Sequence, residues 1–314
     1  MVTAQNIREA ADRILPLARR TPVMTSRSID TRAGLSAYFK CENLQRGGAF
    51  KIRGAANLVL SIPPADLSRG VVAFSSGNHA QATAIAARHV GAPATIVMPH
   101  DAPRAKMQAT RDAGARIVTY DRFTDDREAI AAAVLAETNG TLVPPFDHEL
   151  IIAGQGTATK ELMEDAPEFD ALVVCVGGGG LLAGSATWAR SVRPGIRVFG
   201  VEPELGNDTW LSFAKGERVT IAPPDTIADG LRSPCPGKLT FPVIQQHVEQ
   251  MLLVTEDEIR ATVRFLLERM KILVEPSGAV AAAAVLFGKL PPGIRSAGVI
   301  ISGGNADLEF LATC

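Results

Sequence analysis

Four consecutive glycines form the most distinctive chemical feature of the sequence. Gly177, Gly178, Gly179 and Gly180 follow the apolar run LVVCV at 172–176 and precede the helical pattern LLAGSATWAR. Between a strand and a helix, residues without side chains expose backbone N–H groups, which can bind a phosphate with help from the helix dipole. Four glycines in a row lose much conformational entropy when the chain folds, so a run of this kind is unfavourable unless it has such a role. The run therefore predicts a phosphate-binding loop.

The same loop also fits a second chemistry. Gly178, Gly180 and Ala183 match the pattern G-x-G-x-x-A of dinucleotide-binding proteins. Glu202 ends the next expected strand about 20 residues later, as that fingerprint requires. Taken alone, this loop indicates a nicotinamide-dependent oxidoreductase.

Two further polar loops follow apolar runs. SSGNH at 75–79 comes after VVAF, and SGGN at 302–305 comes after GVII. Hydroxyls, an amide and an imidazole at a helix N-terminus can bind a carboxylate, although an isolated SSGN is more often a helix cap. Together with the glycines, the loops suit a flat polar ligand that carries a phosphate.

Lys51 is the candidate nucleophile. It lies between Phe50 and Ile52 and close to Gly48, and such neighbours favour Schiff-base formation because desolvation lowers the pKa of an ammonium group. A single lysine is far more often a solvated surface charge. The assignment therefore depends on the whole segment KCENLQRGGAFKIRGA at 40–55.

The elements that must position these loops alternate along the chain. Short β-branched runs at 71–74, 94–98, 116–120, 172–176, 196–201 and 298–302 are separated by helical segments that include 80–90, 104–113 and 126–138. This alternation predicts an α/β protein with mostly parallel sheets and crossover helices. The strands fall into two groups, about 70–147 and 170–305, which predicts two α/β domains with a cleft between them. Ligands of such sheets bind beyond the carboxyl ends of the strands.

Composition narrows the class of function. The 314 residues contain 46% hydrophobic side chains, and 32 Lys and Arg balance 33 Asp and Glu. A net charge of -1 provides no field that would attract nucleic acid or an anionic membrane. The charged N-terminus is a poor secretory signal, and no apolar run has transmembrane length. The four cysteines lack metal-type spacing, so we expect a reducing, cytoplasmic location.

The segment around Lys51 closely resembles the lysine motif of the fold-type II pyridoxal-phosphate enzymes, in the branch of threonine/serine dehydratases and serine racemases. The resemblance covers nearly the whole chain, because SSGNHAQA, the glycines, VEP, VEPSGA and SGGN follow in the family's order. It implies a tryptophan synthase β-like fold of two three-layer α/β/α domains. Residues 1–69 and 148–314 would form the large cofactor-binding domain, and 70–147 a small domain that closes over the substrate.

The resemblance also implies a cofactor site. Lys51 would form the Schiff base with pyridoxal 5′-phosphate, and Phe50 would pack beside the ring. Asn78 would contact the ring hydroxyl, Ser302 would face the pyridine nitrogen, and the glycines at 177–180 would hold the phosphate.

A substrate site is implied beside the cofactor. Ser75, Ser76, Asn78 and His79 match the family's site for the substrate carboxylate. Ser76 also matches the residue that serves as the opposite-face acid and base in racemases, which makes it the second catalytic candidate after Lys51. Arg127 is a candidate for a distal substrate contact.

A divalent-cation site is the third implied feature. Glu202, Asp208 and the backbone carbonyl of Gly206 resemble the site of serine racemases and related dehydratases, and such oxygen ligands suit Mg²⁺ or Ca²⁺. The alternative is that Glu202 only ends a strand and Asp208 only begins a helix.

The predicted activity is the dehydration and deamination of a β-hydroxy amino acid, such as threonine, serine or 3-hydroxyaspartate, to a 2-oxo acid and ammonia. A serine at the pyridine nitrogen cannot protonate it as a carboxylate would, which favours elimination over transamination. The family commonly has Thr-Gly-Ser-Phe-Lys where this chain has Gly47-Gly48-Ala49-Phe50-Lys51, so we expect a different preference from plain serine or threonine. The resemblance further implies a homodimer.

Three alternatives stay open. An amino-acid racemase of serine or aspartate type would use the same scaffold. The oxidoreductase leaves Lys51 and SSGNH unexplained, and a non-catalytic amino-acid-binding protein would be expected to have lost the lysine.

Overall fold

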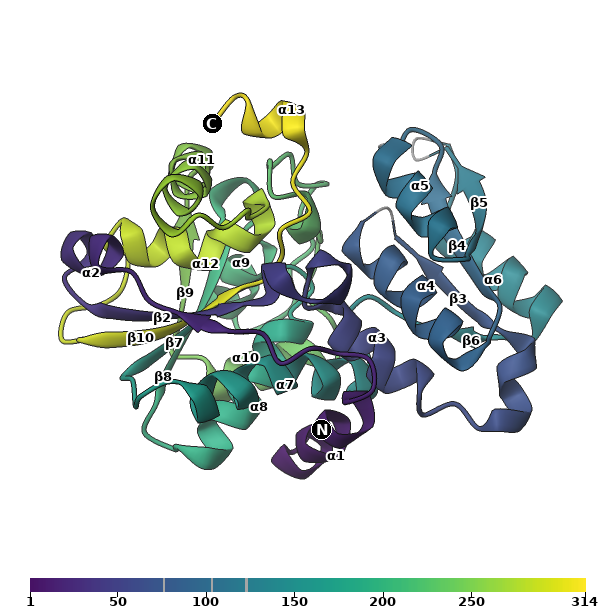
Figure 1. Cartoon of the computed structure of the whole chain (residues 1–314), viewed down its shortest axis with the longest axis horizontal. Helices are drawn as coiled ribbons and strands as arrows, with labels where there is room; N and C mark the ends of the chain where they lie inside the picture. Colours follow the sequence, from purple (N-terminus) through teal and green to yellow (C-terminus); the bar gives the residue numbers. More distant parts are fainter. Residues whose placement is uncertain (76, 103, 122–123) are drawn as a thin grey trace.

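The structure is a computed structural model that describes residues 1–75, 77–102, 104–121 and 124–314. Its strands form two separate sheets (Figure 1). The larger sheet contains, in spatial order, β1 (Val23–Met24), β2 (Ser36–Cys41), β10 (Ser296–Ile301), β7 (Ala171–Cys175), β8 (Arg197–Pro203) and β9 (Gln250–Val254). The smaller sheet contains β5 (Arg116–Tyr120), β4 (Ala94–Pro99), β3 (Val71–Phe74) and β6 (Thr141–Leu142).

Thirteen α-helices of the described chain connect these strands. They are α1 (Ala4–Ile14), α2 (Arg27–Ala33), α3 (Lys51–Val59), α4 (Asn78–Val90), α5 (Arg104–Asp112), α6 (Arg127–Thr138), α7 (Glu149–Asp165), α8 (Gly180–Val192), α9 (Asp208–Lys215), α10 (Thr240–His247), α11 (Glu256–Phe265), α12 (Pro276–Leu286) and α13 (Leu308–Leu311). Among the described residues, none of these helices is both long and apolar enough to cross a membrane.

The larger sheet is parallel except for β1, which pairs with β2 in the antiparallel direction. Helix α12 packs on one face, and α7 and α8 lie on the other (Figure 1). Every residue of β7 is buried, because helices cover both faces of the sheet. Every residue of α12 is buried as well, which explains its nearly continuous run of alanine and valine.

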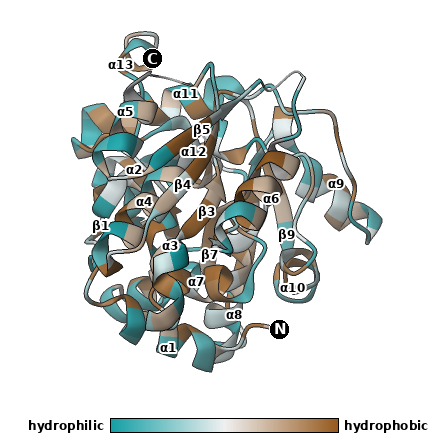
Figure 2. Cartoon of the chain, turned by 90° about the vertical axis from the view of Figure 1, so that its right-hand side faces the viewer, coloured by the Kyte–Doolittle hydropathy of each residue, from teal (hydrophilic) through white to brown (hydrophobic). Residues whose placement is uncertain are grey.

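The smaller sheet is parallel throughout, and α4 and α6 cover its two faces (Figures 1 and 2). Figure 2 shows β3 and β4 as predominantly hydrophobic, in keeping with their place between two helical layers. The structure confirms the predicted α/β class with mostly parallel sheets. All four strands of this sheet lie within 70–147, and the domain boundaries stay a prediction.

The six predicted strand runs correspond to β3, β4, β5, β7, β8 and β10. The sequence analysis did not predict β1, β2, β6 or β9. Strand β2 contains the charged Lys40, yet this side chain is buried and its Nζ lies 2.7 Å from Glu161 Oε2. The ion partner comes from α7, more than a hundred residues away, so local sequence could not reveal it.

Close helix packing brings the predicted loops together. Helix α7 crosses α3 where Gly154 meets Gly54, and it crosses α8 where Gly156 meets Gly184. A Cβ atom on Gly156 would lie 2.8 Å from the backbone oxygen of Gly184, so only glycine allows this approach. Helix α3, which begins at Lys51, and helix α8, which begins in the glycine loop, therefore both pack on α7.

Candidate active site

Lys51 is the first residue of α3, and its side chain points into the site. The Nζ atom donates a hydrogen bond to Pro145 O at 2.7 Å and lies 5.2 Å from the centroid of the Phe50 ring. Burial lowers the pKa of Lys51 to about 8, although the nearby Cys175 and Glu275 act in the opposite direction. A substantial fraction of the amine is therefore neutral, and able to act as nucleophile or base, near physiological pH.

The glycine loop is fixed by its surroundings. Gly179 has a φ of 90°, a left-handed conformation that favours glycine, and it caps α8. A Cβ atom on Gly178 would overlap the ring of Phe146, and one on Gly180 would overlap Gln155 Oε1. Thr240 Oγ1 donates to Gly178 O at 2.8 Å.

These features fit a bound phosphate. The N–H groups in the first turn of α8 have no acceptor within the helix, and the positive end of its dipole lies at the loop. Larger residues at 178 and 180 are excluded by Phe146 and Gln155. The residues present therefore fit the predicted cofactor. Lys51 is linked to the loop through Pro145, whose carbonyl it contacts, and through the adjacent Phe146, which packs on Gly178.

Asn78 of the SSGNH loop connects α4, which packs on the smaller sheet, with loops next to the larger sheet. Asn78 begins α4, and its Nδ2 donates to Glu275 Oε1 at 2.6 Å. Asn305 Nδ2 donates to Asn78 Oδ1 at 2.8 Å. In the same loop, the backbone N–H of Gly77 donates to Ser75 Oγ at 3.2 Å. Ser76, the predicted second catalytic residue, lies outside the described residues.

His79 is buried against the segment that leaves the smaller sheet. Its Nε2 lies 2.8 Å from Val143 O, and its Nδ1 has no hydrogen-bond partner among the described residues. Burial, and secondarily the charge of Lys51, lower the pKa of His79 to about 3. The imidazole is therefore neutral near pH 7, with a proton on Nε2 for the Val143 carbonyl. It offers no positive charge to a substrate carboxylate.

Ser302 directly follows the central strand β10 and is buried. Its Oγ donates to Ser277 O at 3.4 Å, and its backbone oxygen accepts from Phe50 N at 3.0 Å. The neighbouring Cys175 thiol interacts with Ser302, and burial raises the pKa of that thiol to about 11. Both groups are therefore neutral near pH 7.

Glu275 is a site residue that the sequence analysis did not assign. Its carboxylate holds Asn78 and occupies the space that a Cβ atom on Gly303 would need. Its backbone N–H donates to Gly303 O at 3.1 Å. The signal was present in VEPSGA, where an acidic residue directly precedes a helix, but it did not reveal which side chain Glu275 would contact.

The predicted cation ligands lie together on the carboxyl side of β8. Glu202 accepts from Thr209 N at 3.1 Å and from Trp210 N at 2.7 Å, while both carboxylate oxygens of Asp208 lack a partner among the described residues. Burial and the neighbouring Asp208 raise the pKa of Glu202 well above its usual range, and burial raises that of Asp208 to about 7. Two buried carboxylates side by side fit a hard cation. As the alternative describes, Glu202 lies near the end of β8 and Asp208 begins α9. The Glu202 carboxylate also caps α9 through the Thr209 and Trp210 N–H groups.

The oxidoreductase reading gains no support from this geometry. In a dinucleotide site, the acidic residue after the second strand must reach a ribose hydroxyl. Glu202 is fully buried and holds the first N–H groups of α9. Both of its carboxylate oxygens therefore already accept from backbone N–H groups of α9.

Two features lie apart from this site or cannot be placed in it. Arg127 begins α6, and its side chain lies outside the described part of the structure.

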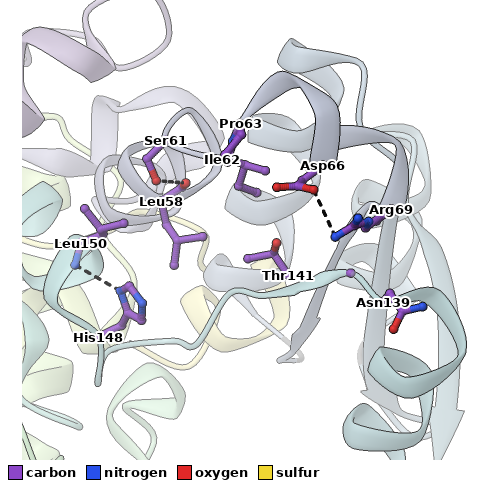
Figure 3. A pocket seen from close by; sticks show the side chains of 11 residues that line it. Leu58, Ser61, Ile62, Pro63, Asp66, Arg69, Asn139, Thr141, His148 and Leu150 are labelled. Carbon is purple, nitrogen blue, oxygen red and sulfur yellow. Dashed lines mark hydrogen bonds and ion pairs between the residues drawn. The ribbon is translucent and has the colours of Figure 1, made fainter.

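A hollow of about 420 Å³ lies at the far end of α3, between Leu58, Arg69, His148 and neighbouring residues (Figure 3). None of the predicted site residues whose side chains the structure describes lines this hollow.

Known proteins share both the sequence and the arrangement of this chain. The L-threo-3-hydroxyaspartate ammonia-lyase of Saccharomyces cerevisiae is 48% identical over 311 residues, covering 99% of this chain and 95% of the relative. The serine racemase of Schizosaccharomyces pombe is 46% identical over 310 residues, covering 99% and 96%. The solved structure of maize serine racemase matches with a TM-score of 0.96 at 41% identity, covering 99% of this chain and 96% of that chain.

A family profile gives the same result over most of the chain. Residues 14–303 match the family described as "Pyridoxal-phosphate dependent enzyme". The matched region includes Lys51, the SSGNH loop, the glycine loop and Ser302. The chain therefore belongs to the family of pyridoxal-phosphate dependent enzymes, as the order of its motifs predicted.

Proposed function

We propose that the protein is an ammonia-lyase that converts a β-hydroxy amino acid, with 3-hydroxyaspartate as the first substrate to test, into a 2-oxo acid and ammonia. The observation that carries the proposal is the desolvated Lys51 amine beside the glycine loop. The name of the 48% identical yeast relative supports both the reaction and the choice of substrate. Threonine and serine are the other substrates to test.

The cofactor, when bound, withdraws electrons from the substrate's Cα atom and so makes its proton removable. Lys51 Nζ is the base that accepts this proton, and Pro145 O orients it. The electron pair left at Cα then forms the double bond to Cβ as the Cβ–O bond breaks and the hydroxyl leaves with a proton as water. Hydrolysis of the resulting enamine gives the 2-oxo acid and ammonia.

Other residues of the chain hold the reacting groups in place. Asn78 is kept in one orientation by Glu275 and Asn305, so its amide can meet the ring hydroxyl without rearranging. Ser302 supplies a neutral hydroxyl to the far end of the ring, which favours elimination over transamination. Ser75, Ser76 and the N-terminus of α4 would bind the substrate carboxylate.

A panel of amino acids tests the proposal. The purified protein should release ammonia and a 2-oxo acid from L-threo-3-hydroxyaspartate faster, by kcat/KM, than from L-threonine or L-serine. Release of 2-oxo acid from none of the three would overturn the proposed reaction. Faster release from serine or threonine would keep the reaction and overturn the choice of substrate.

Racemisation is the second candidate, because the 46% identical relative from Schizosaccharomyces pombe is named a serine racemase. In this reaction Lys51 would act on one face of Cα and Ser76 would return a proton to the other face. Formation of D-serine from L-serine, followed by chiral chromatography, distinguishes racemisation from elimination.

The remaining proposals concern the state of the protein. We propose that Glu202, Asp208 and the Gly206 carbonyl bind Mg²⁺ or Ca²⁺, and that the chain is a cytoplasmic homodimer. We also propose that residues 70–147 move as a small domain that closes over the substrate, with Arg127 contacting its distal end. Light scattering of the purified protein tests the dimer, and fluorescence from a labelled Cys introduced on α6 tests closure.

A further inference from the structure

The buried side chain of Gln155, in the middle of α7, has no role in the site described so far. It is 1% exposed, and neither its Nε2 nor its Oε1 has a hydrogen-bond partner among the described residues. Folded proteins pair the large majority of buried amides, because an unpaired one has lost its water without replacement. A ligand that is not part of the protein chain would supply the missing hydrogen-bond partner.

The direction of the side chain indicates where that partner binds. A Cβ atom on Gly54 would lie 3.1 Å from Gln155 Cγ, and a Cβ atom on Gly180 would overlap Gln155 Oε1. Gly54 lies in the first turn of α3, three residues after Lys51, and Gly180 is the first residue of α8. Its Cγ therefore lies against the first turn of α3, and its amide oxygen lies against the first residue of α8. The N–H groups and dipoles at both helix N-termini favour an anion.

Other polar side chains on α7 differ from Gln155 in having partners. Thr157 Oγ1 donates to Gly154 O at 2.6 Å, and Thr159 Oγ1 donates to Ser185 Oγ at 2.7 Å. The first bond lies within α7, and the second links α7 to α8. Gln155 makes no such bond. A methionine at this position would fill a similar volume and would not bury an amide group that has lost its hydrogen bonds to water.

We propose that the Gln155 amide is part of the phosphate site, where its Nε2 donates a hydrogen bond to a phosphate oxygen. This inference rests on the proposed function, since it takes pyridoxal phosphate to be the ligand. It adds a side-chain contact from α7 to a cradle otherwise made of backbone groups. Because Gln155 lies on α7 and packs against α3 and α8, its hydrogen bond to the phosphate would couple cofactor binding to the packing of these three helices.

The test is Gln155→Met in the full-length protein after removal of the cofactor. The affinity for pyridoxal phosphate should fall about tenfold to a hundredfold, the usual effect of losing a hydrogen bond to a charged group. The affinity for pyridoxal, which lacks the phosphate, should change less than about twofold on the same reasoning. Inorganic phosphate should raise the Tm of the wild type but not of the variant, and the cofactor-free variant should melt no lower than the cofactor-free wild type.

Thr159→Val is the matched control, since Thr159 lies one turn further along the same face of α7 and is also buried. It should lower the Tm of the cofactor-free protein and leave the ratio of the two affinities unchanged. If Gln155→Met behaves like this control, Gln155 is structural and the inference is wrong. If the wild type itself binds no pyridoxal phosphate, the proposed function is wrong as well, so the two failures are distinguishable.

Discussion

Lys51 shows how one residue acquires its chemistry from its surroundings. Burial disfavours its ammonium form, while Cys175 and Glu275 favour it, and the pKa of about 8 shows that burial dominates. Phe50 is one of the groups that exclude water, and Pro145 O accepts a hydrogen bond from the amine. The lysine is thus both positioned and partly deprotonated.

Lys51→Ala removes this amine and should abolish function in two ways. Turnover of β-hydroxy amino acids should fall by a factor of about a hundred to ten thousand or more, because the base that removes the Cα proton is lost. The visible absorbance of the covalently attached cofactor should be absent from the purified variant. Lys215→Ala, which changes an exposed lysine, should keep both properties. Undiminished dehydration by Lys51→Ala would contradict the assignment.

The pKa of Lys51 also predicts how cofactor loading depends on pH. The amine attacks only in its neutral form, and its pKa is lowered from 10.5 to about 8, so the neutral fraction rises with pH and levels off above about 8. Below that value, the rate of covalent loading of the cofactor-free protein should rise about tenfold per pH unit. Stopped-flow absorbance measures this rate. N-acetyllysine amide in the same buffers should keep rising until about pH 10, and identical profiles would contradict a shifted pKa.

The element scale explains why sequence predicted some parts of the site and not others. Strand β7 and the start of α8 follow from local patterns, namely an apolar run and four glycines that a strand-to-helix turn accommodates. Glu275 and Gln155 could not be assigned in this way, since their importance depends on Asn78 and Gly180, which are distant in the chain. Local patterns therefore predict where loops lie, while contacts between helices decide which side chains complete the site.

A buried ion network holds α3 in place and gives a prediction for that element. Arg53 Nε donates to Glu42 Oε2 at 2.7 Å, and its Nη2 lies 2.7 Å from Glu161 Oε2, with both Arg53 and Glu42 fully buried. Arg53→Met leaves Glu42 without its main partner, so the free energy of unfolding should fall by about 3–5 kcal/mol. The midpoint of chemical denaturation measures this change.

The matched control uses an exposed ion pair of the same type. Arg69 Nη1 lies 3.1 Å from Asp66 Oδ1, with the Arg69 side chain 57% exposed. Arg69→Met should change the free energy of unfolding by less than about 1 kcal/mol, because water solvates both charges. Equal effects of the two substitutions would show that the Arg53 network does not stabilise α3.

At the scale of the whole molecule, the site depends on both sheets. The segment that leaves the smaller sheet passes Val143, which holds His79, and Pro145, which holds Lys51. It continues through Phe146, which packs on Gly178, and on into α7. A movement of the smaller sheet would therefore reach the lysine, the glycine loop and the SSGNH loop together.

The predicted cation would stabilise the larger sheet at the carboxyl end of β8, where this strand leads into α9. Asp208 has two buried carboxylate oxygens without a partner among the described residues, beside the buried Glu202. A cation that binds only the folded protein adds about 2.7 kcal/mol of stability at a hundred times its Kd. Exhaustive chelation should therefore lower the Tm by several degrees, and 1 mM Mg²⁺ or Ca²⁺, about a hundred times a Kd near 10 μM, should restore it.

Asp208→Asn distinguishes this site from other effects of the metal. The substitution removes one charge while keeping the shape of the side chain, so the variant should respond to neither chelator nor cation. It should also melt higher than the chelated wild type, because it no longer buries two neighbouring carboxylates without a counterion. A variant whose Tm still follows the cation concentration as the wild type does would show that the cation binds elsewhere. In that case Glu202 would act only as the cap of α9.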